Sequence, residues 1–263
     1  MKTLSLVIPV YNEEKRLKKT FSSLLRGGFS RGMKLHEVIF VNDGSTDTTG
    51  RMIRENKERL SKALSARVRL ISCRQNQGKG HAVKQGMLLS TADYTLLFDC
   101  DMSTPLSEIR KFIPYMKQST PVIIGTRKNG KSTVIIPQPL HRQLLGKAFT
   151  LISNIALGMW ITDFTCGFKA FSKDAKGEIF QRSKIQRWGY DAEILFLASQ
   201  LSYPIKEIAV KWSDDKRTKV NLAHDIISSL FELYAIRENE YTGEYVFAKE
   251  MKTGFVRRFR FAK

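Results

Sequence analysis

The chain has 263 residues, of which 42% are hydrophobic and 26% charged, a balance typical of a folded globular protein and not of a disordered one. Its 44 Lys and Arg against 25 Asp and Glu leave a formal charge of +19, which favours nucleic acid, an anionic membrane surface or a phosphorylated substrate as partner. The three cysteines stand at wide spacings without CxxC pairs, which argues against a zinc site or a disulfide scaffold and indicates a reduced, cytosolic setting.

The first hundred residues alternate short apolar runs with segments of helical periodicity. The N-terminal apolar run is too short for a signal sequence and is interpreted as the first strand. We expect strands at residues 4–10, 37–42, 68–72 and 94–98, and helices at residues 13–25, 48–63 and 81–90. This order predicts a mainly parallel sheet with helices on both faces, whose ligands gather at the carboxyl ends of the strands.

The second half is less regular, and we expect it to bind an acceptor substrate. Residues 122–125 read as a further strand, and residues 141–158 as a helix that follows a proline-containing loop. The longest nearly apolar run, residues 148–161, is interrupted by polar side chains and is shorter than the roughly 18 to 20 apolar residues that span a bilayer. No transmembrane helix is therefore predicted, and without repeats or linkers the chain is not divided into independent domains.

The sequence FDCD places Asp99 and Asp101 two residues apart at the end of a strand. An extended backbone directs both carboxylates the same way, and their repulsion favours a hard divalent cation between them. Mg²⁺ or Mn²⁺ would there bind the oxygens of a diphosphate and neutralise it as it leaves. The alternative is an acidic surface turn.

Two further polar segments follow predicted strands. Asp43, in VNDGSTD, is placed to accept hydrogen bonds from a nucleobase or a ribose, or else to cap the helix that begins near Thr48, a role that Asp47 fits as well. Lys79, in QNQGKGHA, lies between two glycines ahead of a helix, which is typical of a phosphate-binding loop or of a simple tight turn. The P-loop and dinucleotide-binding spacings are absent.

Taken together, these segments resemble family 2 glycosyltransferases with the GT-A fold, a Rossmann-like α/β architecture. The motifs are VIPVYNEE, VNDGSTD, NQGKGHAV and FDCDMST, in this order. GTR at residues 125–127, DFTCGFKAF at residues 163–171 and RWGYDAEILFLA at residues 187–198 narrow the likeness to polyprenyl-phosphate glycosyltransferases, and most to the dolichyl-phosphate β-glucosyltransferase branch. The resemblance covers about residues 3–237.

The resemblance implies a role for several side chains. Pro9, Tyr11 and Glu13 would line a nucleoside pocket together with Asp43, while Asp99 and Asp101 would hold Mg²⁺ or Mn²⁺ and the diphosphate. Arg127 would face the sugar phosphate or the acceptor. The basic Arg217 and Lys219 are candidates to close over the diphosphate, although their segment lacks the glycine usual at that place.

Asp191, in WGYDAE, occupies the region where many family 2 enzymes keep a catalytic base. A phosphate acceptor does not need one, because its second pKa is near 6 and the dianion attacks unaided. Asp191 would then orient groups. The same segment also reads as a helix that packs apolar side chains into the core.

The implied activity is inverting transfer of a hexose, in the first place glucose, from a nucleotide-diphosphate sugar such as UDP-glucose to polyprenyl or dolichyl phosphate. Alternatives are a GDP-mannose-dependent mannosyltransferase acting on the same lipid and a polysaccharide-type enzyme with a sugar acceptor. A nucleic-acid-binding protein would explain the charge, but no recognised motif supports one, and the acidic pair opposes it.

We expect a catalytic domain at residues 1–237 and a basic amphipathic tail at residues 238–263. In the tail four apolar residues recur at a spacing of four among basic ones, as in a helix lying on an anionic membrane; the set is Phe247, Met251, Phe255 and Phe259 with Lys249, Lys252, Arg257, Arg258 and Arg260. Gly254 weakens this helix, and a solvated end or a protein-docking strip are the alternatives. Residues 140–160 are a second candidate surface, and the alternative is that their apolar side belongs to the core. The enzyme is thus expected in the cytoplasm, peripherally bound to the cytosolic face of a membrane.

Overall fold

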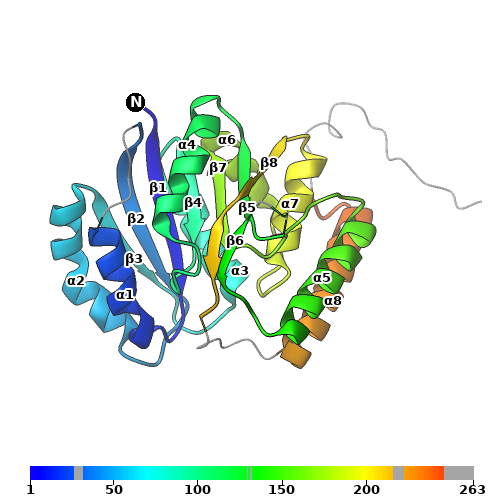
Figure 1. Ribbon diagram of the computed structural model, residues 1–263, viewed down its shortest axis with the longest axis horizontal. Helices are drawn as coiled ribbons and strands as arrows, with labels where there is room; N and C mark the ends of the chain where they lie inside the picture. Colours follow the sequence, from blue (N-terminus) through cyan, green and yellow to red (C-terminus); the bar gives the residue numbers. More distant parts are fainter. Residues whose placement is uncertain (27–31, 129, 131, 216–221, 246–263) are drawn as a thin grey trace, which may run out of the picture.

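The computed structural model describes residues 1–26, 32–128, 130, 132–215 and 222–245, with the side chains of residues 222–226 excepted. A seven-stranded sheet with the order β3-β2-β1-β4-β7-β5-β8 forms the centre of the molecule (Figure 1). Its strands are β1 (Thr3–Val10), β2 (Lys34–Asn42), β3 (Arg67–Ser72), β4 (Tyr94–Phe98), β5 (Val122–Thr126), β7 (Phe168–Ser172) and β8 (Ile205–Ala209). All pairings in this sheet are parallel except those that β7 makes.

Helices cover both faces of the sheet, as the sequence predicts. They are α1 (Glu14–Leu25), α2 (Thr49–Leu64), η1 (Leu106–Glu108) and α4 (Ile109–Lys117) on one face and α3 (Lys79–Leu89), α6 (Lys173–Arg182) and α7 (Tyr190–Gln200) on the other. Successive strand side chains point to opposite faces, so Leu6 and Ile8 pack in the first core layer and Val7 in the second. Both layers are fully buried, which explains why these strands are apolar without strict alternation.

The antiparallel strand β7 shapes the carboxyl edge of the sheet. Phe98, the last residue of β4, is paired with Phe168, the first residue of β7. The segment that enters β7 therefore lies beside the segment that leaves β4, and side chains from both reach the same edge. In a sheet of parallel strands alone, only the segments that leave strands would reach the carboxyl edge.

A second layer of structure stands beside this edge. Strands β6 (Thr133–Ile136) and β9 (Lys211–Ser213) form a short parallel pair, and helices α5 (Leu140–Leu157) and α8 (Leu222–Tyr241) pack side by side, as Figure 1 shows in green and orange. Pro139 precedes the first residue of α5, and Gly158 ends the helix with a φ of +63°, a left-handed conformation that favours glycine.

The predicted strands and helices of the first hundred residues are present, with ends that differ by a few residues; Lys79, for example, already belongs to α3. The expected boundary between Arg237 and Glu238 lies inside α8, and Tyr245 is buried against Phe196 of α7. Tyr245 therefore packs on α7, and residues 238–241 continue helix α8. The basic apolar pattern expected at residues 247–260 lies outside the described residues.

Candidate active site

A cleft of about 600 Å³ opens at the carboxyl edge of the sheet, between the strand ends and helix α5. Its wall includes every predicted site residue that the structure describes: Pro9, Tyr11, Glu13, Asp43, Lys79, Asp99, Asp101, Arg127 and Asp191. Segments far apart in the chain thus converge because their strands end at one edge. Arg217 and Lys219 lie outside the described residues.

The acidic pair follows β4 directly. Lys79 Nζ lies 2.8 Å from Asp99 Oδ1, and the backbone N–H of Ser103 donates to Asp101 Oδ1 at 2.8 Å. Burial, and then the negative charge of Asp99, raise the pKa of Asp101. Burial disfavours the ammonium of Lys79, but the charges of Asp99 and Asp191 outweigh it and raise the pKa of Lys79, which stays cationic.

The donor set at this point fits a hard divalent cation. Asp99 and Asp101 offer carboxylate oxygens from one strand end, and repulsion between them favours a positive charge. Among the residues that the structure describes, no group of three His, Cys, Asp or Glu side chains could hold a metal by itself. Mg²⁺ in such sites keeps several waters and takes its other ligands from substrate phosphates, so two carboxylates suffice.

Gly167, just before β7, leaves room for the first carboxylate. A Cβ atom at this position would lie 1.8 Å from Asp99 Oδ2, far inside the van der Waals limit. The glycine in CGFKAF is therefore required by the close approach of the two chain segments, one leaving β4 and one entering β7.

Asp43 organises the loop in front of α3. Its carboxylate accepts hydrogen bonds from the side chain of Asn76 at 2.8 Å and from the backbone N–H groups of Gln77 and Gly78 at 3.0 and 2.8 Å. Asp43 does not cap α2; that role belongs to Asp47, whose Oδ1 accepts from the N–H of Thr49 at 2.9 Å. Asp43 still lines the cleft, so it shapes the surface that a nucleoside would meet.

On the opposite wall of this part of the cleft, ion pairs connect the start of α1 with the segment that follows β9. Arg16 contacts Glu13 at 3.0 Å and Asp215, which follows β9, at 3.2 Å. Tyr11 is 39% exposed and offers its ring to the cleft. Glu13 is thus held by a cation from the helix that follows it, and Tyr11 lines the cleft together with Pro9 and Val10.

Arg127 is held rigidly at the end of β5. Its guanidinium donates to both oxygens of the buried Asp163 at 2.7 Å and to Thr165 Oγ1 at 2.8 Å, and it stacks 5.3 Å from the ring centre of Trp212. Burial would raise the pKa of Asp163, but the charge and hydrogen bonds of Arg127 hold it well below its usual range. The Nη1 group of Arg127 makes no hydrogen bond to any described residue, so two N–H donors remain for a ligand.

Asp191 lies at the start of α7 and is paired with Lys169 of β7, whose side chain is completely buried. Lys169 Nζ also donates to the carbonyl of Cys166 at 2.8 Å. A buried ammonium needs a countercharge, so this pair holds the side chain of Asp191 in place at the cleft wall. Glu193, two residues on, instead accepts from the N–H groups of Lys184 and Ile185 and from Tyr245 Oη, outside the cleft wall.

Sequence reasoning missed several side chains of this site. Asp163 and Lys169 lie in the quoted segment DFTCGFKAF, but only the fold brings them to Arg127 and Asp191. Arg142 of α5 and Trp212 line the cleft without any earlier signal, while Arg187 and Trp188 lie in the quoted segment RWGYDAEILFLA but were given no role. The segment RWGYDAE held a usable signal, because an arginine directly ahead of a helix is unusual in a core-packing role.

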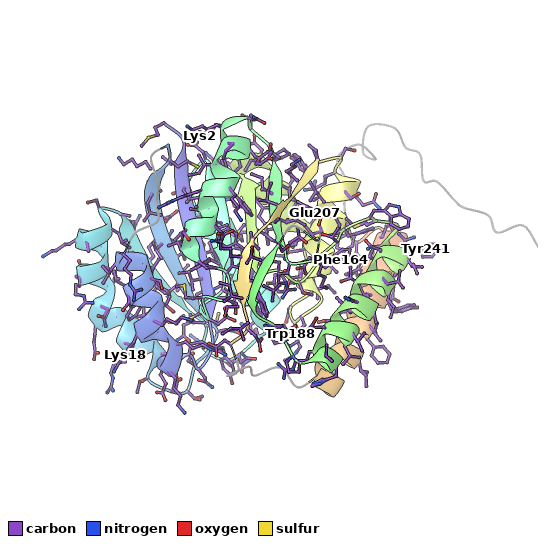
Figure 2. The ribbon with its side chains drawn as sticks, in the orientation of Figure 1. Lys2, Lys18, Phe164, Trp188, Glu207 and Tyr241 are labelled. Atoms are coloured by element: carbon purple, nitrogen blue, oxygen red, sulfur yellow. The ribbon has the colours of Figure 1, made fainter. Side chains whose placement is uncertain are left out.

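The outer side of the helix pair is strongly apolar. Its exposed side chains, here called the α5–α8 face, are Leu140, Leu144, Leu151 and Ile155 of α5, Trp160 after it, and Ile227, Phe231, Tyr234 and Tyr241 of α8. Ile155 is 74% and Phe231 72% exposed, and Figure 2 labels Tyr241 at the far end of α8. Apolar patches of this extent mark interaction sites. Within the described part of the chain, no helix is long and apolar enough to cross a bilayer.

Comparison with known proteins identifies relatives along most of the chain. The family model "Glycosyl transferase family 2" matches residues 5–180. The dolichyl-phosphate beta-glucosyltransferase of Dictyostelium discoideum is 30% identical over 89% of this chain and 73% of its own length. The human protein of the same name is 31% identical over 83% and 70%, and that of Saccharomyces cerevisiae 31% over 92% and 76%.

Solved structures agree on the fold. Glucosyl-3-phosphoglycerate synthase from Mycobacterium tuberculosis, in complex with Mn²⁺, UDP-glucose and phosphoglyceric acid, superposes with a TM-score of 0.61 at 17% identity. The match covers 89% of this chain and 79% of that one. The same enzyme in complex with Mg²⁺ and UDP gives a TM-score of 0.58 at 18% identity over 88% and 79%. The architecture is therefore the GT-A-like fold that the sequence predicts.

Proposed function

Because this chain belongs to glycosyltransferase family 2, we propose that it transfers glucose from UDP-glucose to dolichyl or another polyprenyl phosphate, at the cytosolic face of a membrane. One observation carries the proposal. A single cleft joins an acidic pair at the strand ends to arginines beside α5, and the same helix presents its other side as an exposed apolar face. The acidic pair suits a diphosphate donor, the arginines suit a phosphate acceptor, and the apolar face suits a lipid surface.

The donor belongs on the β1–β4 side of the cleft. Tyr11 and the loop held by Asp43 offer a surface for the nucleoside, and Asp99 and Asp101 would hold Mg²⁺ or Mn²⁺ against the diphosphate. When bound, this ion would neutralise the charge that develops on the leaving UDP. Lys79 supplies a second cation within reach of the same phosphates, as expected of a lysine at the start of a helix.

The acceptor phosphate belongs on the arginine side. Arg127 presents its two remaining N–H donors from a guanidinium that Asp163 and Trp212 hold in place. Arg142 of α5 also lines the cleft, and its side chain makes no ion pair within the described residues. A phosphate dianion would satisfy these donors, because Arg binds phosphate oxygens in pairs.

The reaction then needs no general base. An oxygen of the acceptor phosphate dianion attacks the anomeric carbon, the bond from that carbon to the UDP oxygen breaks, and the configuration inverts. Asp191, which Lys169 holds in place, orients the sugar and prevents it from binding in other positions. The arginines hold the phosphate nucleophile. Catalysis in this scheme comes from positioning and charge neutralisation.

The α5–α8 face would bring the enzyme to its lipid. Leucine, isoleucine and aromatic side chains on neighbouring helices are suited to bury a few ångströms deep in the interfacial layer of a bilayer, and Trp160 and Tyr241 are the ring types that prefer this depth. The +19 charge adds attraction to an anionic leaflet. The lipid tail could then remain in the membrane while its phosphate enters the cleft beside Arg142.

A transfer assay tests the proposal. Purified protein with Mn²⁺ is incubated with a short polyprenyl phosphate and either UDP-glucose or GDP-mannose, each carrying a labelled sugar. We expect labelled lipid from UDP-glucose. Labelled lipid from GDP-mannose alone would identify a mannosyltransferase, and transfer only to a free sugar or oligosaccharide would contradict a lipid phosphate acceptor.

Asp101→Asn separates the chemistry from the fold. Asparagine keeps the side-chain shape and one acceptor oxygen but removes the charge that the cation needs. We expect transfer to fall at least about 100-fold, with an unchanged thermal unfolding midpoint. Full activity of Asp101→Asn would contradict the metal role of the pair.

A further inference from the structure

The segment between α6 and α7, residues 184–189, forms one side of the proposed donor site. Two of its side chains, Arg187 and Trp188, line the cleft, and the Trp188 ring centre lies 5.7 Å from Lys79 Nζ. In the view of Figure 2, Trp188 lies between the strand ends and the α5–α8 pair. The placement of this segment therefore decides where an aromatic ring stands beside Lys79, the lysine that contacts Asp99, and where Arg187 lines the cleft.

The backbone of this segment rests directly on the glycine-rich loop before α3. The N–H of His81 donates to the carbonyl of Gln186 at 3.0 Å. A Cβ atom on Gly78 would lie 2.4 Å from this carbonyl oxygen, and one on Gly80 would lie 2.6 Å from the carbonyl oxygen of Ile185. Residues 184–189 can approach Gly78 and the first turn of α3 this closely only because positions 78 and 80 are glycine, so a shift of one segment moves the other.

Two carboxylates anchor the segment at its ends. Glu193 of α7 accepts from the N–H of Lys184 at 2.8 Å and of Ile185 at 3.0 Å. Glu232 of α8 accepts from the N–H of Gly189 at 2.7 Å, where α7 begins. Gly189 has no room for a side chain, because a Cβ atom would lie 2.7 Å from that of Glu232.

The second anchor comes from the helix that carries half of the apolar face. Phe231 and Tyr234, on either side of Glu232 in the sequence, point outward and are about 70% exposed, while Ser229 reaches the cleft. Helix α8 thus has an outer apolar side, and on its inner side Ser229 and Glu232 touch the cleft and the segment beside it.

We infer that Glu232 is a positioning residue, which ties α8 to residues 184–189 and so sets the affinity of the cleft for the nucleotide of the donor. The inference rests on the proposed function only in placing the donor diphosphate beside Lys79 and Asp99. Glu232 touches neither substrate; it acts through Gly189, Trp188 and Arg187.

Nucleotide binding tests this role without requiring transfer. The dissociation constant of UDP with Mn²⁺ is measured by calorimetry, beside donor and acceptor KM values and the thermal unfolding midpoint. Glu232→Ala removes a hydrogen bond to a charged acceptor, so we expect the UDP dissociation constant and donor KM to rise about tenfold, with the acceptor KM unchanged. Glu232→Gln keeps an acceptor oxygen in place and should restore most of this loss.

Controls separate positioning from stability. Glu238→Ala, at an exposed site on the same helix, removes the same charge without touching the segment and should bind UDP like the natural chain. If Glu232→Ala does not fold, Glu232→Asp, which is one methylene too short to reach Gly189, should weaken UDP binding in its place. A lowered unfolding midpoint with an unchanged UDP dissociation constant would overturn the inference.

The outcomes also distinguish this inference from the proposed function. If the natural chain binds UDP but transfers glucose to no lipid phosphate, the proposed function is overturned. The UDP dissociation constants of the variants then still decide the role of Glu232. UDP binding that ignores Glu232, beside normal transfer to lipid, would overturn the positioning role alone. Failure to bind either UDP or GDP would overturn both.

Discussion

Lys79 Nζ lies 2.8 Å from Asp99 Oδ1, so an ammonium group already neutralises the first carboxylate of the acidic pair. The same nitrogen is 5.7 Å from the ring centre of Trp188 and 6.0 Å from that of Tyr190. Both rings attract its positive charge through cation–π interactions. In the proposed donor site, an incoming divalent cation would take Asp99 from Lys79. The lysine would then be available to the diphosphate that arrives with the cation.

Lys79→Met should therefore have opposite effects on metal binding and on transfer. Without nucleotide, Mn²⁺ should bind several-fold more tightly, because its competitor for Asp99 is gone. The rate of transfer should fall about tenfold or more, because the diphosphate loses a cation. Calorimetry with Mn²⁺ and the lipid transfer assay measure the two effects, and Lys62→Met, at an exposed site on α2, is the control. Weaker Mn²⁺ binding in Lys79→Met would contradict this competition.

Gly167→Ala should remove activity through a single methyl group. The new Cβ would overlap Asp99 Oδ2, so the carboxylate or the start of β7 must shift. We expect at least about a 100-fold loss of transfer and a loss of Mn²⁺ affinity, since a displacement of about 1 Å has this effect at a reacting centre. Gly177→Ala on α6 is a matched control, because a Cβ there meets nothing within 4 Å and should stabilise the helix by up to about 1 kcal/mol.

The pair of Arg127 and Asp163 predicts an acid-sensitive contribution to stability. The pKa of Asp163 is lowered from its ordinary value of 3.8, so the contribution is present above pH 3.8 and is lost as the pH falls through the lower pKa of the folded state. Asp163→Asn should lower the free energy of unfolding at pH 7 by about 3 kcal/mol, because Arg127 loses its buried partner. Its stability should also depend less on pH below 3.8.

Urea unfolding at several pH values measures both effects. Asp174→Asn, at an exposed site in the first turn of α6, removes an acidic group without a buried partner and serves as control. An equal acid dependence in the natural chain and in Asp163→Asn would show that the pair does not contribute.

The α5–α8 face predicts binding to vesicles. The double variant Leu151→Glu with Phe231→Glu places two charges where apolar groups would enter the bilayer. Burying such side chains contributes about 1.5 to 3 kcal/mol each, so flotation with anionic vesicles should weaken at least about tenfold, while UDP binding is retained. Leu89→Glu, on an exposed part of α3, is the control. A chain ending at Tyr245 measures the separate contribution of residues 246–263.

The donor half of the site was open to prediction because each of its motifs follows a strand within a few residues. Asp99 and Asp101 could be placed on one edge with Asp43 from strand periodicity alone, since parallel strands end together. The partners of Arg127 and Asp191 could not, because Asp163 and Lys169 reach them through the antiparallel strand β7, and nothing local in the sequence indicates that β7 inserts between β4 and β5.

The α8 helix shows a second limit of local reasoning. Its hydrophobic residues occur on both sides, so periodicity does not separate the face that packs on α7 from the face that is exposed. Tyr245, expected in a basic tail, is buried because its ring packs on Phe196 and its hydroxyl donates to Glu193. A contact across fifty residues of chain decides this outcome, not the composition of the tail.

Strands β5 and β7 are antiparallel neighbours. Residues 127–167 therefore form one long connection between the two strands of a hairpin, here called the excursion. This excursion carries β6 and α5 and contributes Arg142 to the cleft, whereas the acidic pair belongs to β4 outside it. Both ends of the excursion are fixed by the same pair of strands. Its interior can therefore change in length and chemistry without moving Asp99 or Asp101, which would make the proposed acceptor side a module that can be exchanged on an unchanged acidic pair.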